Sequence, residues 1–345
     1  MSPSATGWPG DRGGHVWPKD REVVADDGAR IRYTVEGADD GPWMVLCSGY
    51  MCPDNFWMYA APRWMETHRV IVLNYRGVGA STDPRPPGYR ALNVSAADYT
   101  VERFAGDVAA VLAAEGATEV AVVGHSMGVQ VALQVWRTVP DRVAGLALVT
   151  GPYASPLHTF YGSKLGVALF PFASLGLTLA PRRVQRIVGL TLRSPIALPL
   201  ARLIKALGPE TPLEGMQPYF DHFDRVDPMV ALKIAKGMHR FDAGPWLDEV
   251  DVPTLVVVGS EDRFSPPALG RAMVQVMPDA ELVEIPGGTH GALIEFPERI
   301  ADAVAAFLRR RVGPEAEGSP GGGPEVAWPS SATPTKGVTS SPEQA

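Results

Sequence analysis

The sequence predicts an α/β protein, and three observations lead to this prediction. Short continuous runs of apolar and β-branched residues, typical of buried strands, recur along the chain and alternate with helical apolar spacing. One such run, 120–123, stops abruptly at Gly124-His125-Ser126-Met127-Gly128 and resumes as the apolar segment 129–133. A chain of 345 residues with 46% hydrophobic residues can bury one large α/β core or two modest domains. We therefore expect one core that carries an insertion.

Composition and charge exclude several classes of protein. The formal net charge of −7 provides no basic face, and a polyanion requires clustered Lys and Arg, so we expect no nucleic-acid partner. Segment 1–20 lacks the apolar core of a signal peptide, which leads us to expect a cytoplasmic protein. Two cysteines, Cys47 and Cys52, are too few for a disulfide framework, and we expect both to be reduced. The histidines are scattered without metal-ligand spacing, so we expect no metal.

Four strands are expected ahead of the pentapeptide at 124–128. Each is an apolar or alternating run bounded by turn residues, at 21–25, 30–37, 43–47 and 69–74. The first two form a hairpin around the turn at 26–28. The third ends in Ser48-Gly49-Tyr50-Met51, a glycine turn directly after a buried strand.

Two further segments complete the first half of the chain. The turn after the fourth strand contains Gly77-Val78-Gly79, but it lacks the third glycine and the acidic partner of a dinucleotide fingerprint, so we expect no nucleotide cofactor. Segment 100–116 has helical spacing and ends at Gly116, a residue suited to terminate a helix. Its apolar stripe is formed by Val101, Phe104, Val108, Val111 and Leu112.

The pentapeptide has the form Gly-x-Ser-x-Gly between a strand and a helix. A serine hydroxyl is a weak nucleophile, so an enzyme that uses one must lift it clear of the fold. A sharp strand-to-helix turn does this by driving the serine toward positive φ and crowding the residues two before and two after it, where Gly124 and Gly128 stand. The helix expected to start at Ser126 points free amides and its positive dipole end at charge developing beside the hydroxyl.

The second half of the chain resumes the strand pattern after a long interruption. Segment 143–149 is a buried strand, after which regular alternation lapses for about a hundred residues. Strands are then expected at 253–259 and 281–285, and an amphipathic helix at 297–311. From Gly313 onward Pro, Gly, Ser and Glu dominate, which predicts a disordered tail.

The order of these features resembles the α/β-hydrolase superfamily, and Gly-His-Ser-Met-Gly is similar to its serine esterase, lipase and cofactor-free perhydrolase branch. The resemblance covers 21–312. It implies an α/β-hydrolase fold, a mostly parallel eight-stranded sheet flanked by helices with an inserted helical cap. It also implies a division into an N-terminal extension (1–20), a core (21–151 and 251–312), a helical cap or lid (152–250) and a tail (313–345).

The same resemblance implies a catalytic triad. The nucleophile falls on Ser126, and the acid of the pattern Gly-x-x-Asp after the strand 253–259 falls on Asp262. Glu261 is the alternative acid if that loop is read one residue differently. The base falls on His290, which follows the last strand in a glycine-rich loop, so the chain order is Ser, Asp, His.

The oxyanion hole implied by the resemblance consists of backbone N–H groups of Tyr50 and Met127. Two residues depart from the family pattern. Ser48 stands where a histidine is usual and Asn74 where an aspartate is commoner. Because the donors are backbone groups, the change at position 48 leaves them in place.

The implied activity is hydrolysis of carboxylic esters with apolar acyl groups, without a cofactor. Perhydrolase, thioesterase, lactonase, acyltransferase and carbon–carbon bond hydrolase chemistry stay open on the same triad, and a ligand-binding receptor is the non-enzyme alternative on this fold. A serine at position 126 argues against haloalkane dehalogenase and epoxide hydrolase relatives, which need an aspartate there. An aminopeptidase would need carboxylates in the cap, and the first part of the cap has none.

The segment after Gly151 is apolar and cationic. Up to Pro209 it contains no Asp or Glu, and it has seven Lys and Arg: Lys164, Arg182, Arg183, Arg186, Arg193, Arg202 and Lys205. In one interpretation the apolar residues pack on the core while the cations reach water. In the other an acyl pocket lies beside a surface that attracts anionic lipid or a carboxylate-bearing substrate. The apolar run 165–180 is too short to cross a bilayer. The residues expected to roof the pocket are Leu165, Val167, Leu169, Phe170 and Phe172.

Overall fold

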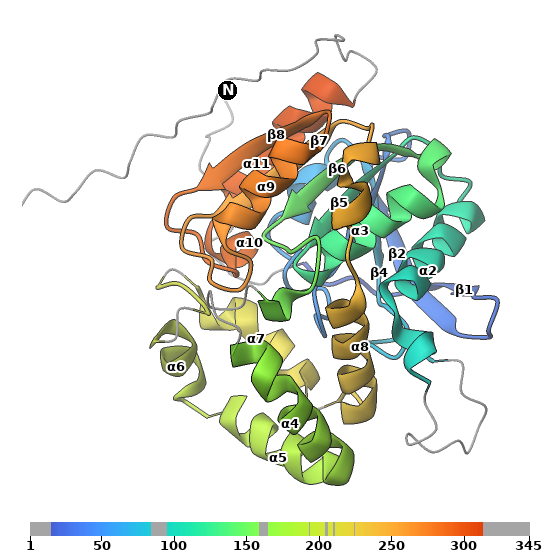
Figure 1. Ribbon diagram of the computed structural model, residues 1–345. Helices are drawn as coiled ribbons and strands as arrows, with labels where there is room; N and C mark the ends of the chain where they lie inside the picture. Colours follow the sequence, from blue (N-terminus) through green and yellow to red (C-terminus); the bar gives the residue numbers. More distant parts are fainter. Residues whose placement is uncertain are drawn as a thin grey trace, which may run out of the picture.

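The computed structural model describes residues 15–83, 95–158, 165–192, 194–203, 206–209, 211–223 and 225–312. Eight strands form one sheet in the order β1-β2-β4-β3-β5-β6-β7-β8 (Figure 1). Pairing is antiparallel between β1 and β2 and between β2 and β4, and parallel elsewhere, so the predicted mostly parallel eight-stranded sheet is confirmed. The strands are β1 (Arg21–Val24), β2 (Arg30–Gly37), β3 (Trp43–Cys47), β4 (Arg69–Leu73), β5 (Val120–His125), β6 (Val143–Val149), β7 (Thr254–Gly259) and β8 (Ala280–Ile285).

Helices cover both faces of the sheet. The central strands are buried on both sides, which explains why they appear in the sequence as continuous apolar runs rather than alternating ones. The sequence pattern did not indicate the short helices or the helix that follows β7. One face carries α2 (Val101–Ala114), α3 (Met127–Thr138) and α9 (Pro267–Val276), and the other α1 (Ala61–Met65), α10 (Ala292–Glu295) and α11 (Pro297–Arg311).

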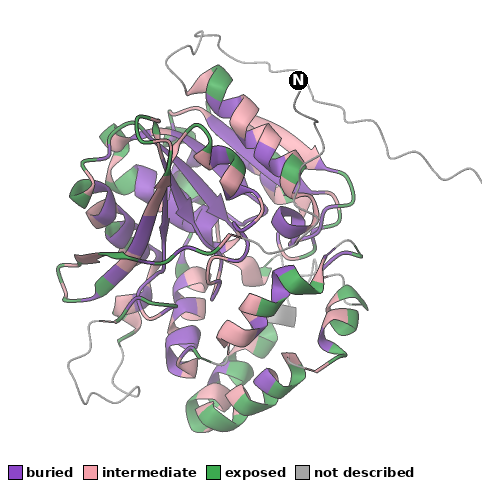
Figure 2. Ribbon diagram, turned by 180° about the vertical axis from the view of Figure 1, so that it is seen from behind, coloured by how far each residue is buried: buried purple, intermediate pink, exposed green. Residues whose placement is uncertain are grey.

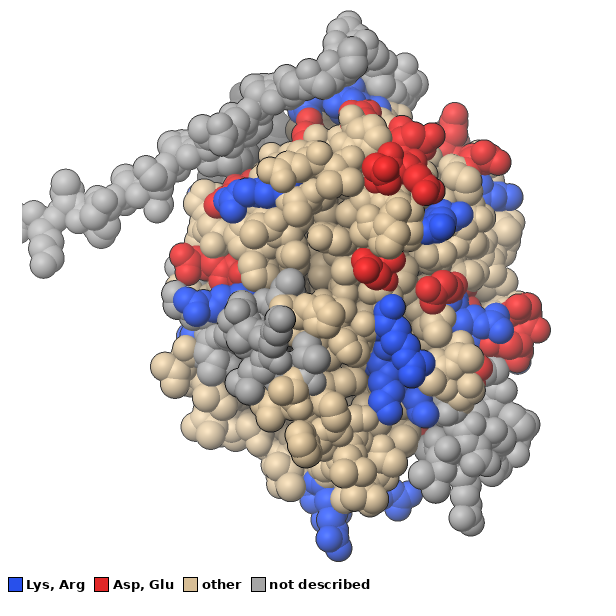
Figure 3. Space-filling view, in the orientation of Figure 1, with Lys and Arg blue, Asp and Glu red and all other residues tan. Residues whose placement is uncertain are grey.

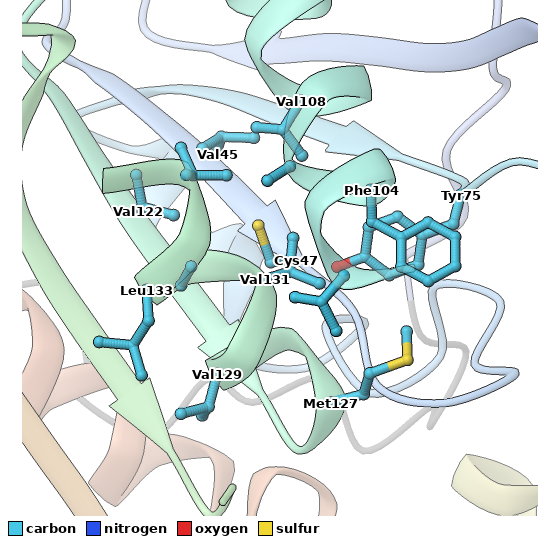
Figure 4. Close-up of a cluster of buried hydrophobic side chains, with 14 of the residues drawn as sticks. Val45, Cys47, Tyr75, Phe104, Val108, Val122, Met127, Val129, Val131 and Leu133 are labelled. Carbon is cyan, nitrogen blue, oxygen red and sulfur yellow. The ribbon is translucent and has the colours of Figure 1, made fainter. Parts of the chain in front are cut away.

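The helix α2 turns the predicted apolar stripe toward the sheet. Its N-terminus is capped by Thr100, whose hydroxyl accepts a hydrogen bond from the Arg103 N–H at 3.3 Å. Gly116, at φ 63°, ends the segment with the left-handed conformation that glycine tolerates. Figure 4 shows Phe104 and Val108 of this helix in one apolar cluster with residues of β3, β5 and α3. This packing holds α3, and with it the end of β5, against the sheet.

Five further helices lie between β6 and β7, within the range expected for a cap, and we call them the inserted helices. Figure 1 shows them gathered at one end of the molecule, with α4 and α5 farthest from the sheet, while α7 and α8 contribute residues to the core. Much of the surface of α4 to α6 is exposed, as Figure 2 shows. In the described ranges of the chain, no helix is long and apolar enough to cross a membrane. The inserted helices are α4 (Leu165–Leu179), α5 (Pro181–Leu192), α6 (Ala197–Leu203), α7 (Leu213–Phe223) and α8 (Pro228–Arg240).

Part of the expected N-terminal extension packs on the core. Trp17 and Lys19 are only 4% and 5% exposed, and Trp17 joins the apolar cluster beneath α11. The Lys19 ammonium lies 2.6 Å from the Asp54 carboxylate, which belongs to the loop after β3. Residues 1–14 and the expected tail 313–345 lie outside the described residues. Segment 15–20 therefore supports a loop that, as described below, borders the candidate active site.

The contact between α3 and β3 depends on Gly128, and the substitution Gly128→Ala is expected to prevent folding. An added Cβ would lie 1.8 Å from the Cys47 carbonyl oxygen, a backbone atom that cannot move unless the helix separates from the strand. Gly106→Ala, in α2, is the control, because its added Cβ meets nothing within 4 Å, and we expect it to stabilise the fold by about 0.5–1 kcal/mol. Thermal unfolding measures both. A Gly128→Ala protein with the melting temperature of the wild type would contradict this close packing.

Candidate active site

Ser126 occupies the predicted sharp turn between β5 and α3. Its φ of 56° and ψ of −120° lie outside the conformations that side-chain-bearing residues favour, as the Gly-x-Ser-x-Gly pattern predicted. The glycines are needed on either side, since a Cβ at Gly124 would lie 2.3 Å from the Gly128 carbonyl oxygen. The helix begins at Met127, one residue after the predicted start, because Ser126 itself is the non-helical cap residue.

Residues from three distant parts of the chain meet at this serine. His290, in the loop after β8, places Nε2 2.8 Å from the Ser126 hydroxyl oxygen. On the other side of the ring, Nδ1 lies 3.0 Å from Oδ2 of Asp262, in the loop after β7. Because a carboxylate only accepts, the Nδ1–H group donates to Asp262, and Nε2 is left to accept the serine proton. The three side chains thus form a continuous hydrogen-bonded line.

The Asp262 carboxylate is almost completely buried but well supplied with donors. The backbone N–H groups of Phe264 and Ser265 donate to Oδ1 at 2.8 and 3.0 Å, and the Ser265 hydroxyl donates to Oδ2 at 2.9 Å. Burial alone would raise the pKa of Asp262. The charge and hydrogen bond of His290, together with the two N–H groups, outweigh burial and lower this pKa below its usual range. The carboxylate therefore stays ionised at neutral pH.

The two candidate acids, Glu261 and Asp262, differ in exposure and in orientation. Glu261 is exposed, and its backbone N–H donates to the Gly288 carbonyl at 2.9 Å, whereas the Asp262 side chain points at His290. Sequence reasoning did not single out Ser265, which also lies 3.3 Å from His290 Nδ1. The available signal was the spacing Asp-x-x-Ser, since Asp side chains often bond to groups two or three residues ahead.

The loop that carries His290 is held by two residues that the motif analysis did not use. The Nε2–H group of His125 donates to the His290 carbonyl at 3.2 Å. Burial, together with the charge of His290, lowers the pKa of His125 to about 3, so His125 stays neutral. Glu295 accepts hydrogen bonds from Thr289, Gly208 and Thr211 at 2.6–2.9 Å. It thereby joins the histidine loop to the segment between α6 and α7.

Both expected oxyanion donors belong to segments that border Ser126. Met127 is the first residue of α3, so its N–H has no hydrogen-bond partner within the helix. Tyr50 belongs to the loop after β3, and a Cβ at the neighbouring Gly49 would lie 3.1 Å from Ser126 Cβ. The Tyr50 hydroxyl donates to the Ala231 carbonyl at 3.0 Å and so ties this loop to α8.

A cavity of about 350 Å³ opens beside Ser126. Apolar and aromatic side chains make up most of its lining, and they come from the core loops and from the inserted helices α4, α7 and α8. A separate hollow of about 640 Å³ lies around α7 and does not reach Ser126. The lining of the first cavity includes Tyr50, Cys52, Phe56, Leu157, Phe170, Met216, Tyr219, Ala235, Met238 and Phe264.

The prediction that five residues between 165 and 172 roof the pocket is wrong for two of them. Phe170 lines the cavity, but Leu169 and Phe172 are 53% and 73% exposed and point away from it. Because nearly every residue of α4 is apolar, its sequence has no polar face from which the orientation could be read. The side chains of Leu165 and Val167 lie outside the described residues. Met216, Tyr219 and Met238, which sequence reasoning missed, supply the wall instead.

In the described ranges, no group of three or more His, Cys, Asp and Glu residues could hold a metal ion. Cys47 and Cys52 are buried and unbridged, and burial raises the pKa of the Cys47 thiol to about 12.

Comparisons with known proteins find relatives that are described as hydrolases. The profile of the α/β hydrolase fold family matches residues 42–297. A Klebsiella pneumoniae protein described as the carbamate hydrolase RutD is 24% identical over 271 residues, which is 77% of this chain and 92% of that protein. A thermophilic esterase structure from Thermogutta terrifontis has a TM-score of 0.62 at 25% identity, covering 85% of this chain and 99% of that one. An enol-lactonase from Burkholderia xenovorans shares the fold, with a TM-score of 0.61 at 21% identity over 84% of this chain and all of its own.

Proposed function

The chain belongs to the α/β-hydrolase family, and from this premise we propose that it is a serine hydrolase that cleaves carboxylic esters of apolar acyl groups. The observation that carries the proposal is the line from the Ser126 hydroxyl through His290 to Asp262 at the edge of an apolar cavity. The relatives are named as hydrolases of carbamates, esters and lactones, and all of these substrates present an acyl carbonyl. The apolar lining favours esters with a hydrocarbon acyl group among them.

In the proposed mechanism His290 first acts as a base. Its Nε2 accepts the Ser126 proton while the serine oxygen bonds to the carbonyl carbon, which places a negative charge on the carbonyl oxygen. The imidazolium then gives this proton to the leaving alcohol as the carbon–oxygen bond breaks, and an acyl-serine remains. Water repeats the two steps, releases the carboxylic acid and restores the serine. Asp262 holds Nδ1–H and stabilises the imidazolium in both halves of the reaction.

The carbonyl oxygen needs donors at the moment when it becomes charged. We assign this role to the backbone N–H groups of Tyr50 and Met127, which belong to the two segments that border Ser126. Loss of one such donor typically removes about 2.7–4 kcal/mol of transition-state stabilisation. The ion pair between the buried Lys19 and the half-buried Asp54 supports this loop from outside the site.

The inserted helices would act as a cap over the acyl group. Phe170 of α4, Tyr219 of α7 and Met238 of α8 lie across the cavity from the core loops. In this role they exclude water and give each buried methylene of the substrate an apolar environment.

A series of nitrophenyl esters with increasing acyl chain length tests the proposal. Each methylene buried in the cavity contributes about 0.8 kcal/mol, so kcat/KM is expected to rise about three- to fourfold per carbon until the cavity is full. Phe170→Ala should reduce this slope, because Phe170 lines the cavity. Phe172→Ala is the matched control on the same helix, and since Phe172 is 73% exposed we expect no change.

The contrary outcomes are distinct. A rate that ignores chain length would overturn the apolar acyl pocket, and faster cleavage of lactones, thioesters or carbamates than of esters would overturn the ester assignment. A serine-directed phosphonate separates an enzyme from a receptor. Stoichiometric labelling at Ser126 is expected, and a folded protein that stays unlabelled would be a binder.

A further inference from the structure

Large apolar side chains are exposed mainly on one part of the molecule. Among the described residues, nine of the thirteen exposed large hydrophobic residues lie between 169 and 203, on α4, α5, α6 and the turn before α6. Exposures there range from 43% for Leu200 to 79% for Leu203. Scattered exposed apolar residues are normal on a protein surface, but a concentration of this kind marks an interaction site.

The exposed residues form stripes along the helices. In α4 the spacing of three, three and four residues places its exposed members on one face. In α6 the spacing of four and three does the same, and α5 contacts both of these helices. Figure 1 shows α4 and α5 together at the end of the molecule farthest from the sheet. The residues are Leu169, Phe172, Leu175 and Leu179 on α4, Ile187 and Leu190 on α5, and Ile196, Leu200 and Leu203 at α6.

Cations lie among these apolar residues, and the segment 151–209 contains no Asp or Glu. Arg182, Arg183 and Arg186 of α5 and Arg202 of α6 are exposed. In the orientation of Figure 3 the end of the molecule formed by α4 and α5 is tan and blue, whereas the red side chains lie nearer the sheet. Between Gly151 and Pro209 the formal charge is +7, so the rest of a chain whose net charge is −7 carries −14. This asymmetry gives the molecule a preferred orientation in the field of an anionic surface.

We propose that this face, the nine apolar residues together with the four arginines, docks on the surface of an anionic lipid bilayer. The apolar side chains would enter the boundary between headgroups and acyl chains, and the arginines would meet the lipid phosphates. A second copy of the chain fits this face poorly, because a symmetric dimer would bring the two arginine groups together. A bilayer supplies both the negative charge and the apolar layer that the face requires.

The face lies directly behind the cavity wall. In α4, Phe170 lines the cavity while its neighbours Leu169 and Phe172 are on the docking face. If the proposed ester hydrolase activity is correct, docking would bring the acyl pocket close to the bilayer, where long-chain esters dissolve. The docking itself does not depend on that activity.

Co-sedimentation with vesicles tests the docking. Vesicles of equal phosphatidylcholine and phosphatidylglycerol should carry the full-length protein down at low salt, vesicles of phosphatidylcholine alone much less, and rising ionic strength should release it. The combined variant Arg182→Gln, Arg183→Gln, Arg186→Gln should bind on the order of a hundredfold more weakly. A matched variant, Arg63→Gln, Arg103→Gln, Arg271→Gln, loses the same charge from two exposed sites and one half-buried site elsewhere, and it should bind like the wild type.

Controls separate the docking from catalysis and from other partners. Ser126→Ala should still bind vesicles, so a missing esterase activity would leave this result intact, and both arginine variants should hydrolyse a soluble short ester at wild-type rates. Equal binding by the two arginine variants, or no binding to anionic vesicles at low salt, would overturn the proposal. Self-association in solution that Phe172→Ser abolishes would also overturn it, because the face would then be an interface between two copies.

Discussion

Ser126→Ala is expected to lower kcat by about a millionfold, and His290→Ala and the double variant are expected to lose about the same amount. Enzymes of this mechanism use the two groups as one unit, because the serine attacks only while the histidine removes its proton. With the 2.8 Å contact between Nε2 and the serine oxygen lost, neither partner can replace the other. A residual rate about 10³–10⁴ above water should persist from the oxyanion donors and from substrate binding.

Steady-state kinetics on the best nitrophenyl ester measures these losses, with thermal unfolding as the check that each variant folds. Losses that multiply in the double variant would mean that the two residues act independently. That result would overturn the assignment of Ser126 and His290 to one catalytic unit.

Asp262→Asn is expected to lower kcat about ten-thousandfold while leaving the fold intact. An amide at this position can donate to Nδ1, which shifts the ring proton to Nε2 and leaves no lone pair to receive the serine proton. The two backbone N–H groups that donate to Oδ1 keep the side chain in place, and the Ser265 hydroxyl can turn to accept from the new amide N–H.

Glu261→Gln is the matched control in the adjacent position. Its side chain is exposed, so kcat should change little. If Glu261→Gln were the more damaging substitution, the acid would have been assigned to the wrong residue of the loop.

The parts of the site that could be predicted are those fixed by local backbone geometry. The strand, the two glycines and the serine at 124–128 imply positive φ at Ser126 before any partner is known, and the structure has it at 56°. Asp262 and His290 were assigned through the resemblance, and in the structure both follow parallel strands whose carboxyl ends lie at the same edge of the sheet as that of β5.

The parts that could not be predicted depend on tertiary packing. Trp17 and Lys19 belong to a segment without strand or helix periodicity. Lys19 is placed by distant partners, because its ammonium lies beside Asp54, its N–H donates to Thr34 and its carbonyl accepts from Arg32. Glu295 has no distinguishing motif in the sequence, yet its carboxylate accepts hydrogen bonds from both the histidine loop and the segment before α7. The face that α4 turns to the cavity is likewise set by its packing against α5, α8 and the segment 156–158, and not by its own uniformly apolar residues.

At position 126 the residue that would make the fold most stable is not the residue that the proposed reaction needs. A φ of 56° with ψ of −120° suits glycine, and a serine held there raises the free energy of the folded state by about 1–3 kcal/mol. Glycine would remove that strain, but it has no hydroxyl. Selection for a more stable fold alone would therefore favour glycine at this position. A serine here is the residue expected if the proposed nucleophile is needed.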